Sequence, residues 1–272
     1  YFDLFSLYLY KLRIMYILGD THGNWKHILW MVKQKSIKDT TIYHVGDIGV
    51  GFIAYDQEME NLEWINEQFK KFNIVFYGIR GNHDNPYFFD GTVNMTNLKL
   101  LPDYTLVNIE GKGVLGVGGA TSIDRRPRIV ENEANIRYGN DRKCYWTGEK
   151  FILDEDKLEE LKPGDVDIVV THTAPAFCYP RNDNGFAPIV EDFARNDGKL
   201  KTELTIERGK LNQMYELLNK TQTLDKWFYG HFHKHEITLE GNTEFICLDI
   251  NQLYDIVDYT DYEKEMNEKY GE

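Results

Sequence analysis

The sequence predicts an α/β fold with a partly parallel sheet. Short runs rich in Ile, Val, Tyr and Phe, which are typical of buried strands, are separated by longer segments with apolar residues at helical spacing. Five of these apolar runs end in a cluster of Asp, Asn or His, which predicts a site at one edge of a sheet. With 272 residues, of which 42% are hydrophobic, the chain is long enough to bury the core of one large domain.

The first half of the chain predicts the order strand, helix, strand, helix, strand. The apolar run that begins at Ile14 and Met15 predicts the first strand, and residues 25–35 have the spacing of an amphipathic helix. The run at residues 42–45 predicts the second strand, and residues 56–72 predict the second helix. The third strand is expected directly before GNHD at Gly81.

The second half contains shorter β segments and fewer helices. The strands are expected at residues 105–110, 112–119, 167–172, 226–231, 235–240 and 244–250. A helix near residues 154–161 begins with acidic residues, which suit the positive end of a helix, and residues 189–218 are expected to be mainly helical. The acidic tail from Asp255 onward predicts a solvated terminal helix or a frayed end.

The five polar clusters contain the side chains that a pair of divalent cations needs. They are GDTHGN from Gly19, GDIGVG from Gly46, GNHD from Gly81, THT from Thr171 and GHFH from Gly230. A two-metal site requires a carboxylate that bridges the ions, with imidazole and oxygen ligands around each. Asp20 and His22 are two residues apart, so in an extended segment they would point the same way, and His231 and His233 repeat this spacing.

This ordered series resembles the calcineurin-like metallophosphoesterase superfamily, in particular its bacterial and phage members, from Gly19 to His233. The resemblance implies two mixed β-sheets packed as a sandwich flanked by helices, in four layers. It also implies a ligand set for two metals: Asp20, His22 and His233 for the first, Asn82, His172 and His231 for the second, and Asp47 as the bridge.

The resemblance further implies a phosphoesterase that hydrolyses phosphomonoesters or phosphodiesters. Two divalent ions, expected to be Mn, Fe or Zn, lower the pKa of water and neutralise phosphate oxygens, so a hydroxide that bridges them attacks phosphorus. His83 is expected to protonate the leaving oxygen or to stabilise charge on the phosphoryl group, with Asp84 as its orienting partner. The expected substrates are phosphorylated small molecules, nucleotides or phosphoproteins.

Two alternatives remain open. The Ser/Thr protein phosphatases of this superfamily carry an Asp-Arg pair after the second motif, whereas Gly49 follows Asp47 and Ile48 here; only Arg80, before GNHD, resembles that branch. The other alternative is a catalytically inactive metal-binding module that interacts with partner proteins. Intact ligands and His83 argue against this second possibility.

A basic cluster in the middle of the chain has two interpretations. Arg125, Arg126 and Arg128 could bind a phosphate or an acidic group of the substrate, or they could lie in a solvated loop and pair with Glu131 and Glu133. Trp146 is expected to fill a gap in the core rather than to cover the site. The three other histidines, His27, His44 and His235, are predicted to lie outside the site.

Composition limits the other classes of function. The 31 basic and 44 acidic residues give a net charge of −13, which disfavours non-specific nucleic-acid binding. Cys144, Cys178 and Cys247 have no metal-type spacing, so we expect free thiols and a cytoplasmic, non-membrane protein.

Met15 is expected to be the natural start of a single domain over residues 15–272, with residues 1–14 an added upstream extension; a genuine N-terminal strand or membrane-touching segment is the alternative. The oligomeric state is not predicted.

Overall fold

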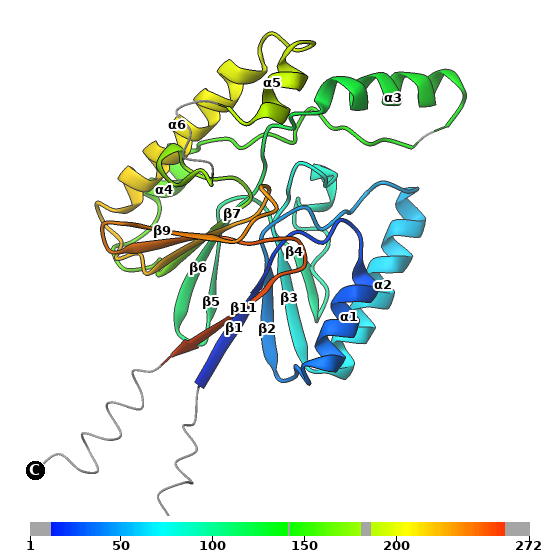
Figure 1. The fold of residues 1–272 in the computed structure, drawn as a ribbon. Coiled ribbons are helices and arrows are strands. Elements are labelled where there is room, and N and C mark those ends of the chain that lie inside the picture. Colours follow the sequence, from blue (N-terminus) through cyan, green and yellow to red (C-terminus); the bar gives the residue numbers. More distant parts are fainter. Residues whose placement is uncertain (1–11, 141, 181–185, 259–272) are drawn as a thin grey trace, which may run out of the picture.

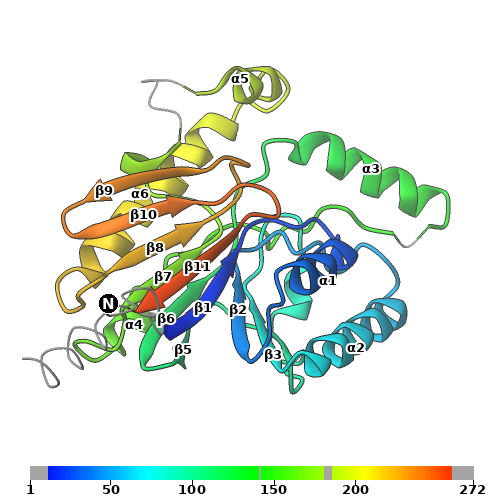
Figure 2. The ribbon, with the colours of Figure 1, turned by 60° about the horizontal axis from the view of Figure 1, so that its bottom comes forward.

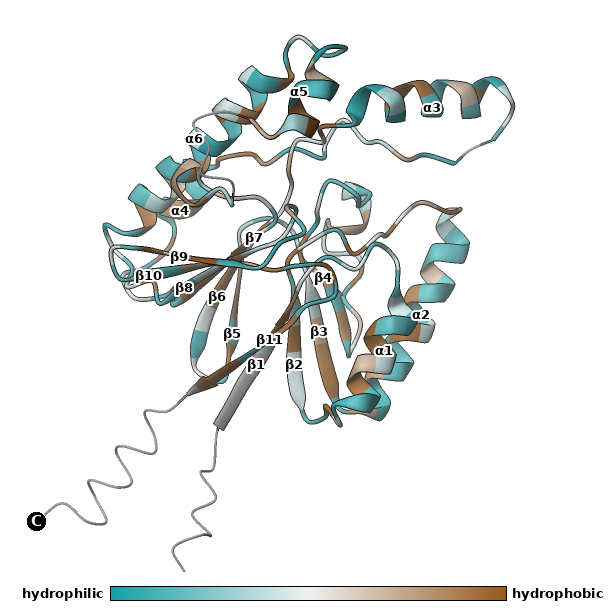
Figure 3. Cartoon of the chain, viewed as in Figure 1, coloured by the Kyte–Doolittle hydropathy of each residue, from teal (hydrophilic) through white to brown (hydrophobic). Residues whose placement is uncertain are grey.

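Two β-sheets pack face to face between two layers of helices (Figure 1). The computed structural model describes residues 12–140, 142–180 and 186–258. Hydrophobic residues lie along the strands and on the part of α1 that faces the sheet (Figure 3). The predicted α/β sandwich is therefore confirmed, and its four layers follow the alternation of apolar residues along the strands.

The first sheet has five strands in the order β11-β1-β2-β3-β4. β1 to β4 run parallel, and β11 pairs with β1 in the antiparallel direction. Their bounds are β1 (Leu12–Leu18), β2 (Thr40–His44), β3 (Ile74–Gly78), β4 (Leu98–Leu100) and β11 (Leu253–Asp258). Because β1, β2 and β3 are parallel, their carboxyl ends lie at one edge of the sheet.

The second sheet has six strands in the order β5-β6-β7-β8-β10-β9. The four central strands are parallel, and the edge strands β5 and β9 are antiparallel to their neighbours. Their bounds are β5 (Thr105–Ile109), β6 (Lys112–Val117), β7 (Ile168–Thr171), β8 (Lys226–Tyr229), β9 (Glu236–Glu240) and β10 (Thr243–Cys247).

Alternation along β1 shows how the layers are built. Met15 and Ile17 point into the core between the sheets, whereas Tyr16 and Leu18 belong to the core under the outer helices. Helices α1 (Trp25–Gln34) and α2 (Tyr55–Lys71) cover that outer face. Each strand residue is thereby buried on one side or the other, which explains the nearly continuous apolar runs.

The second sheet is covered by α6 (Leu200–Leu218) and the short α4 (Glu155–Glu159), with Asp154 capping α4 through a bond to the Lys157 amide. Helices α3 (Arg125–Arg137) and α5 (Pro188–Ala194) lie beyond the edge of the sandwich, and α3 extends away from both sheets (Figure 2). Two 3₁₀ turns are found at Pro86–Phe88 and Ala176–Cys178. No helix in the described part of the chain is long and apolar enough to cross a membrane.

Some sequence expectations were wrong. The basic segment from Arg125 is a helix rather than a loop. The start of the acidic tail is neither helical nor frayed, because Leu253–Asp258 pairs with β1 as an edge strand. Residues 259–272 and 1–11 lie outside the described residues, so the proposed boundary at Met15 stays a prediction, although β1 itself begins at Leu12.

Candidate metal centre

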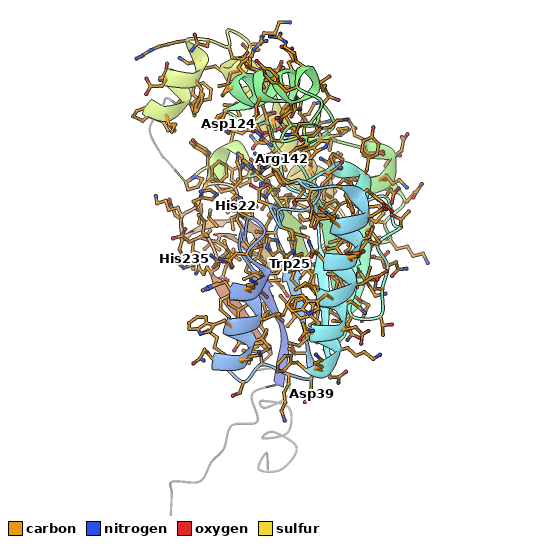
Figure 4. All side chains as sticks on the ribbon, turned by 90° about the vertical axis from the view of Figure 1, so that its right-hand side faces the viewer. His22, Trp25, Asp39, Asp124, Arg142 and His235 are labelled. Carbon is orange, nitrogen blue, oxygen red and sulfur yellow. The ribbon has the colours of Figure 1, made fainter. Side chains whose placement is uncertain are left out.

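The polar clusters follow five strands and meet at one end of the sandwich. Asp20 follows β1, Asp47 follows β2 and Asn82 follows β3 of the first sheet, while His172 follows β7 and His231 follows β8 of the second. Figure 4 shows His22 at this end, on the same side as Asp124 and opposite Asp39. The site is thus built from the carboxyl ends of parallel strands of both sheets.

Two glycines of the motifs make room for the carboxylates. A Cβ on Gly81 would lie 2.0 Å from Asp47 Oδ1, and a Cβ on Gly230 would lie 2.0 Å from Asp20 Oδ1. No real side chain could approach so closely, so any residue other than glycine would displace the carboxylate. The glycines of GNHD and GHFH therefore have a packing role at the site.

The ligands are delivered by turns rather than by extended chain. His22, Asp47, His231 and His233 all have positive φ, between 47° and 68°. Neither pair, Asp20 with His22 or His231 with His233, therefore lies in an extended segment, although all four residues reach the site. Non-glycine residues in this region of φ are held there by surrounding contacts and are frequent at functional sites.

One half of the centre consists of Asp20, His22, Asp47 and His233, whose possible ligand atoms all lie within 4.8 Å of one another. His22 Nε2 lies 3.0 Å from His233 Nε2, and His233 Nε2 lies 3.3 Å from Asp20 Oδ2. The hydrogen bond with Asp20 raises the pKa of His233, and burial opposes this effect. The His231 backbone amide also donates to the Asp20 carboxylate at 3.0 Å.

The other half is buried. His172 Nε2 lies 3.0 Å from Asn82 Oδ1 and 3.1 Å from Asp47 Oδ1, and the His231 ring packs edge-on against His172 at 5.1 Å between centroids. Burial lowers the pKa of His172, but the Asp47 carboxylate outweighs it, and the pKa is raised to about 9. Burial, with His172 nearby, holds the pKa of His231 well below its usual value, which favours a neutral imidazole.

The donor atoms of the buried half fit a cation. His172 Nδ1 lies 2.9 Å from the Val45 carbonyl, which can only accept, so Nδ1 carries a proton and neutral His172 leaves the Nε2 lone pair facing two oxygens. The Nε2 lone pair and these two oxygens repel one another, and a proton or a metal ion between them removes this repulsion. Imidazole, carboxylate and amide oxygen form a donor set that suits first-row divalent ions.

Asp47 belongs to both halves. Its Oδ2 lies 3.9 Å from His22 Nδ1, while its Oδ1 faces His172 and accepts from the His83 amide at 2.7 Å. Burial by itself would raise the pKa of Asp47, but the surrounding imidazoles, His172 above all, hold it well below the usual range. An ionised carboxylate between two groups of imidazole and oxygen donors has the chemistry required of a metal bridge.

A model of the calcineurin-like phosphoesterase family matches residues 15–235. The chain belongs to this family. It is therefore a metallophosphoesterase, a hydrolase that acts on phosphoesters, and the cluster just described is its candidate metal site. A search of curated protein sequences gave no significant match.

Among solved structures, this phosphoesterase is similar to the phosphopantetheinyl hydrolase of Mycobacterium tuberculosis, with a TM-score of 0.47 and 13% identity over 89% of this chain and 95% of that one. It is also similar to a putative 5′-nucleotidase from Staphylococcus aureus, with a TM-score of 0.40 and 13% identity over 89% of this chain and 50% of that one. A third similar structure is GAP50, the anchor in the inner membrane complex of Plasmodium, with a TM-score of 0.39 and 14% identity over 86% and 71%.

His83 and Asp84 occupy different environments in the phosphoesterase. His83 is partly buried at the cluster, with its ring centroid 5.4 Å from that of His22. The Asp84 carboxylate accepts from the backbone amides of Ile48, Gly49, Val50 and Gly81, and within the described residues no hydrogen bond joins it to the His83 ring. Asp84 thus ties the Asp47 loop to the GNHD loop, and the expected orienting contact with His83 is absent.

A polar network that motif analysis missed fixes the orientation of Asn82. Asn82 Nδ2 donates to Ser122 Oγ at 2.9 Å, Arg128 Nη1 donates to the same oxygen at 2.7 Å, and Ser122 Oγ donates to Glu149 Oε2 at 2.7 Å. With its amide nitrogen engaged, Asn82 turns Oδ1 toward His172. Only the Gly-Gly-Ala-Thr-Ser turn in the sequence hinted at this network, and nothing there linked Ser122 to Asn82.

The arginines predicted as phosphate ligands, or as surface pairs with Glu131 and Glu133, form other bonds. Arg125 is buried and pairs with Asp197 and Glu203, and Arg126 lies 3.6 Å from Asp197. Arg128 donates to the carbonyls of Asn82 and Cys144. Within the described residues, none of these three arginines forms an ion pair with Glu131 or Glu133.

Three other residues also have structural contacts. Arg80 is 5% exposed and bonds Asp103 and the carbonyls of Gly148, Glu149 and Lys150, so its guanidinium is occupied. Trp146 is buried and packs edge-on against Phe52, in agreement with its expected core role. Burial lowers the pKa of His44 to about 3, and neutral His44 bonds Thr21 Oγ1 and the Gly46 amide beneath the site.

Proposed function

We propose that the protein is a dimetal phosphoesterase that hydrolyses phosphomonoesters or phosphodiesters of small molecules, nucleotides or proteins. Asp20, His22 and His233 would hold one ion, Asn82, His172 and His231 would hold the other, and the Asp47 carboxylate would be shared between them. The observation that carries this proposal is the Asp47 carboxylate, one oxygen of which faces His172 while the other faces His22.

The ions, when bound, lower the pKa of water so that it becomes a nucleophile, and they neutralise phosphate oxygens. Manganese, iron and zinc all suit this mixture of imidazole and oxygen ligands. The protein supplies fixed geometry, because the predicted ligands lie on loops anchored at strand ends, and Asp84 joins two of these loops through hydrogen bonds. Such preorganisation reduces the reorganisation that the reaction would otherwise require.

His83 acts on the leaving group. It lies at the same cleft as Asp47, Asn82, His231 and His233, and its backbone amide fixes Asp47. From this position its ring donates a proton to the departing oxygen, or a hydrogen bond to a phosphoryl oxygen. The Arg80 guanidinium is engaged in structural bonds rather than facing a phosphate, which disfavours the protein phosphatase alternative.

Kinetics of the metal-loaded enzyme test this role. We expect His83→Ala to lower kcat for phenyl phosphate by ~10²–10⁴ with metal content unchanged, and the defect to shrink for 4-nitrophenyl phosphate, whose leaving group needs no proton. His27→Ala, on the surface helix α1, is the control. Equal rates for the wild type and His83→Ala with both substrates would refute the assignment.

A metal titration with a monoester and a diester assayed side by side tests the remaining alternatives. Turnover that rises as two equivalents of metal bind supports the dimetal enzyme, and the ratio of the two rates defines the substrate preference. Stoichiometric metal binding without turnover of either ester would instead identify an inactive interaction module.

A further inference from the structure

A cleft of about 360 Å³ opens directly from the metal cluster. Asp47, Asn82 and the two histidines of GHFH line one side, and residues of α5 and α6 line the other. This volume is within the range of pockets that bind small organic molecules. The cleft therefore extends beyond what a bare phosphate at the cluster would fill.

The wall that α5 and α6 contribute is mostly apolar. Val190 and Leu204 are buried in it, whereas Ile189 is 51% exposed. Phe232, which also lines the cleft, lies edge-on against Tyr179, at 4.9 Å between ring centroids, and against His231, at 5.0 Å. A ligand that covers apolar surface exposed to water is stabilised by the hydrophobic effect.

Among the described residues that line the cleft, Arg208 is the cation available to a ligand. Its guanidinium carbon lies 3.6 Å from the Tyr179 ring centroid and 5.3 Å from that of Phe186, so the guanidinium packs against aromatic rings. Within the described residues, no carboxylate forms an ion pair with it, and burial lowers its pKa. A partly buried guanidinium of this kind favours an anionic oxygen.

Apart from the predicted metal ligands and His83, the other charged side chains among the described residues of the cleft have partners of opposite charge. Lys234 donates to the Pro180 carbonyl at 2.8 Å and to Glu236. Asp124 lies 3.6 Å from Arg128. These pairs reduce the charge that Lys234 and Asp124 present to a ligand beside Arg208.

We propose that this cleft binds the organic part of a small phosphoester that carries an apolar or aromatic group. The phosphoryl group lies at the metal cluster, the organic group covers Ile189 and Phe232, and the edge of Arg208 holds a phosphoryl oxygen. This inference rests on the proposed function, since it describes the substrate of the same site. It favours a small-molecule substrate over a phosphoprotein.

Calorimetry of the metal-loaded protein with non-hydrolysable phosphonates tests the apolar wall. We expect benzylphosphonate to bind roughly tenfold or more tightly than methylphosphonate, because only the benzyl group covers the wall. Ile189→Asn, which removes apolar surface without adding charge, should abolish most of this difference. Ile206→Asn is the matched control, because Ile206 is 53% exposed on α6 outside the cleft. Equal affinities for the two phosphonates in the wild type would overturn the proposal.

A second variant tests the cation. Arg208→Gln should weaken both phosphonates about tenfold, as expected for a lost charge-assisted hydrogen bond, whereas Arg195→Gln, which removes an exposed arginine, should weaken neither. Unchanged phosphonate affinity in Arg208→Gln would show that Arg208 does not bind the phosphoryl group.

The phosphonate series separates this inference from the proposed function. Selective binding of benzylphosphonate without turnover of any phosphoester would refute the proposed catalytic function but support the proposed binding role of the cleft. Turnover of phenyl and methyl phosphates together with equal phosphonate affinities would retain catalysis and refute the cleft.

Discussion

The two halves of the candidate metal centre differ in how their side chains are supported. In the buried half, the His172 side chain is fully buried and its Nδ1 bonds a backbone carbonyl, while Asn82 is fixed through Ser122. In the open half, the side chains of His22 and His233 are 32% and 43% exposed and meet each other at 3.0 Å. The side chains of the buried half are therefore oriented by other parts of the protein, whereas His22 and His233 mainly contact each other and solvent.

Because of this difference, we expect the two halves to bind metal ions with unequal affinity. Ligands whose partners fix their orientation lose little freedom when an ion binds, whereas exposed imidazoles on turns must be ordered. We therefore expect the buried half to bind its ion more tightly and to exchange it more slowly. Because Asp47 belongs to both halves, its substitution should impair metal binding in both.

The largest effect is expected for Asp47→Asn. The neutral amide bridges two cations poorly, so turnover of an aryl phosphate should fall by ~10³ or more, and both ions should be lost on dialysis. Metal analysis and kcat measure the two effects. Asp39→Asn is the control, because exposed Asp39 shares the positive φ of Asp47 and lies at the other end of the sandwich. Two retained ions with full activity would show that Asp47 is no bridge.

Histidine deletions should separate the halves. His172→Ala should lose one ion and also destabilise the apoprotein by about 1–3 kcal/mol, because the buried Val45 carbonyl loses its partner. His233→Ala should lose one ion with the unfolding free energy changed by about 0.5 kcal/mol or less. Metal analysis and urea unfolding in chelator give both quantities. Equal destabilisation by the two variants would contradict the unequal support of the halves.

Ser122→Ala should weaken only the buried half. Without the hydroxyl, Asn82 Nδ2 and Arg128 Nη1 lose their shared acceptor, and Asn82 can rotate its amide away from the ion. We expect metal affinity at one of two sites to fall about 10–100-fold, measured by competition with a chelator. The control is Ser36→Ala on the surface. A uniform loss at both sites would indicate a general folding defect.

The smallest effect concerns Glu149. Burial raises the pKa of Glu149 from 4.5 to about 7, against the hydrogen bonds from Ser122. Because the folded pKa is raised, its contribution to stability is fully present below pH 4.5 and is lost as pH rises through 7. Wild-type apoprotein should therefore lose stability relative to Glu149→Gln across this interval, as measured by urea midpoints. Parallel pH profiles for the two proteins would refute this linkage.

Much of the fold followed from local pattern. Apolar runs predicted β1, β2, β7 and β8, and helical spacing placed α1 and α2 within one or two residues. The strand β11 was missed because its alternation is weak and acidic residues surround it; pairing with β1 determines it. Helix α3 was missed because most of its polar surface is exposed and two buried arginines, rather than apolar residues, anchor it.

The sequence alone determined which residue types gather at the strand ends, because each motif is local and its glycines and ligands lie within a few positions. It could not determine that Ser122 and Arg128 orient Asn82, that Asp84 ties two loops together, or that α5 and α6 wall a cleft beside the cluster. These contacts join segments 34 or more residues apart, or elements of different sheets. Only the packing of the sandwich brings such segments together, since no local pattern specifies a long-range partner.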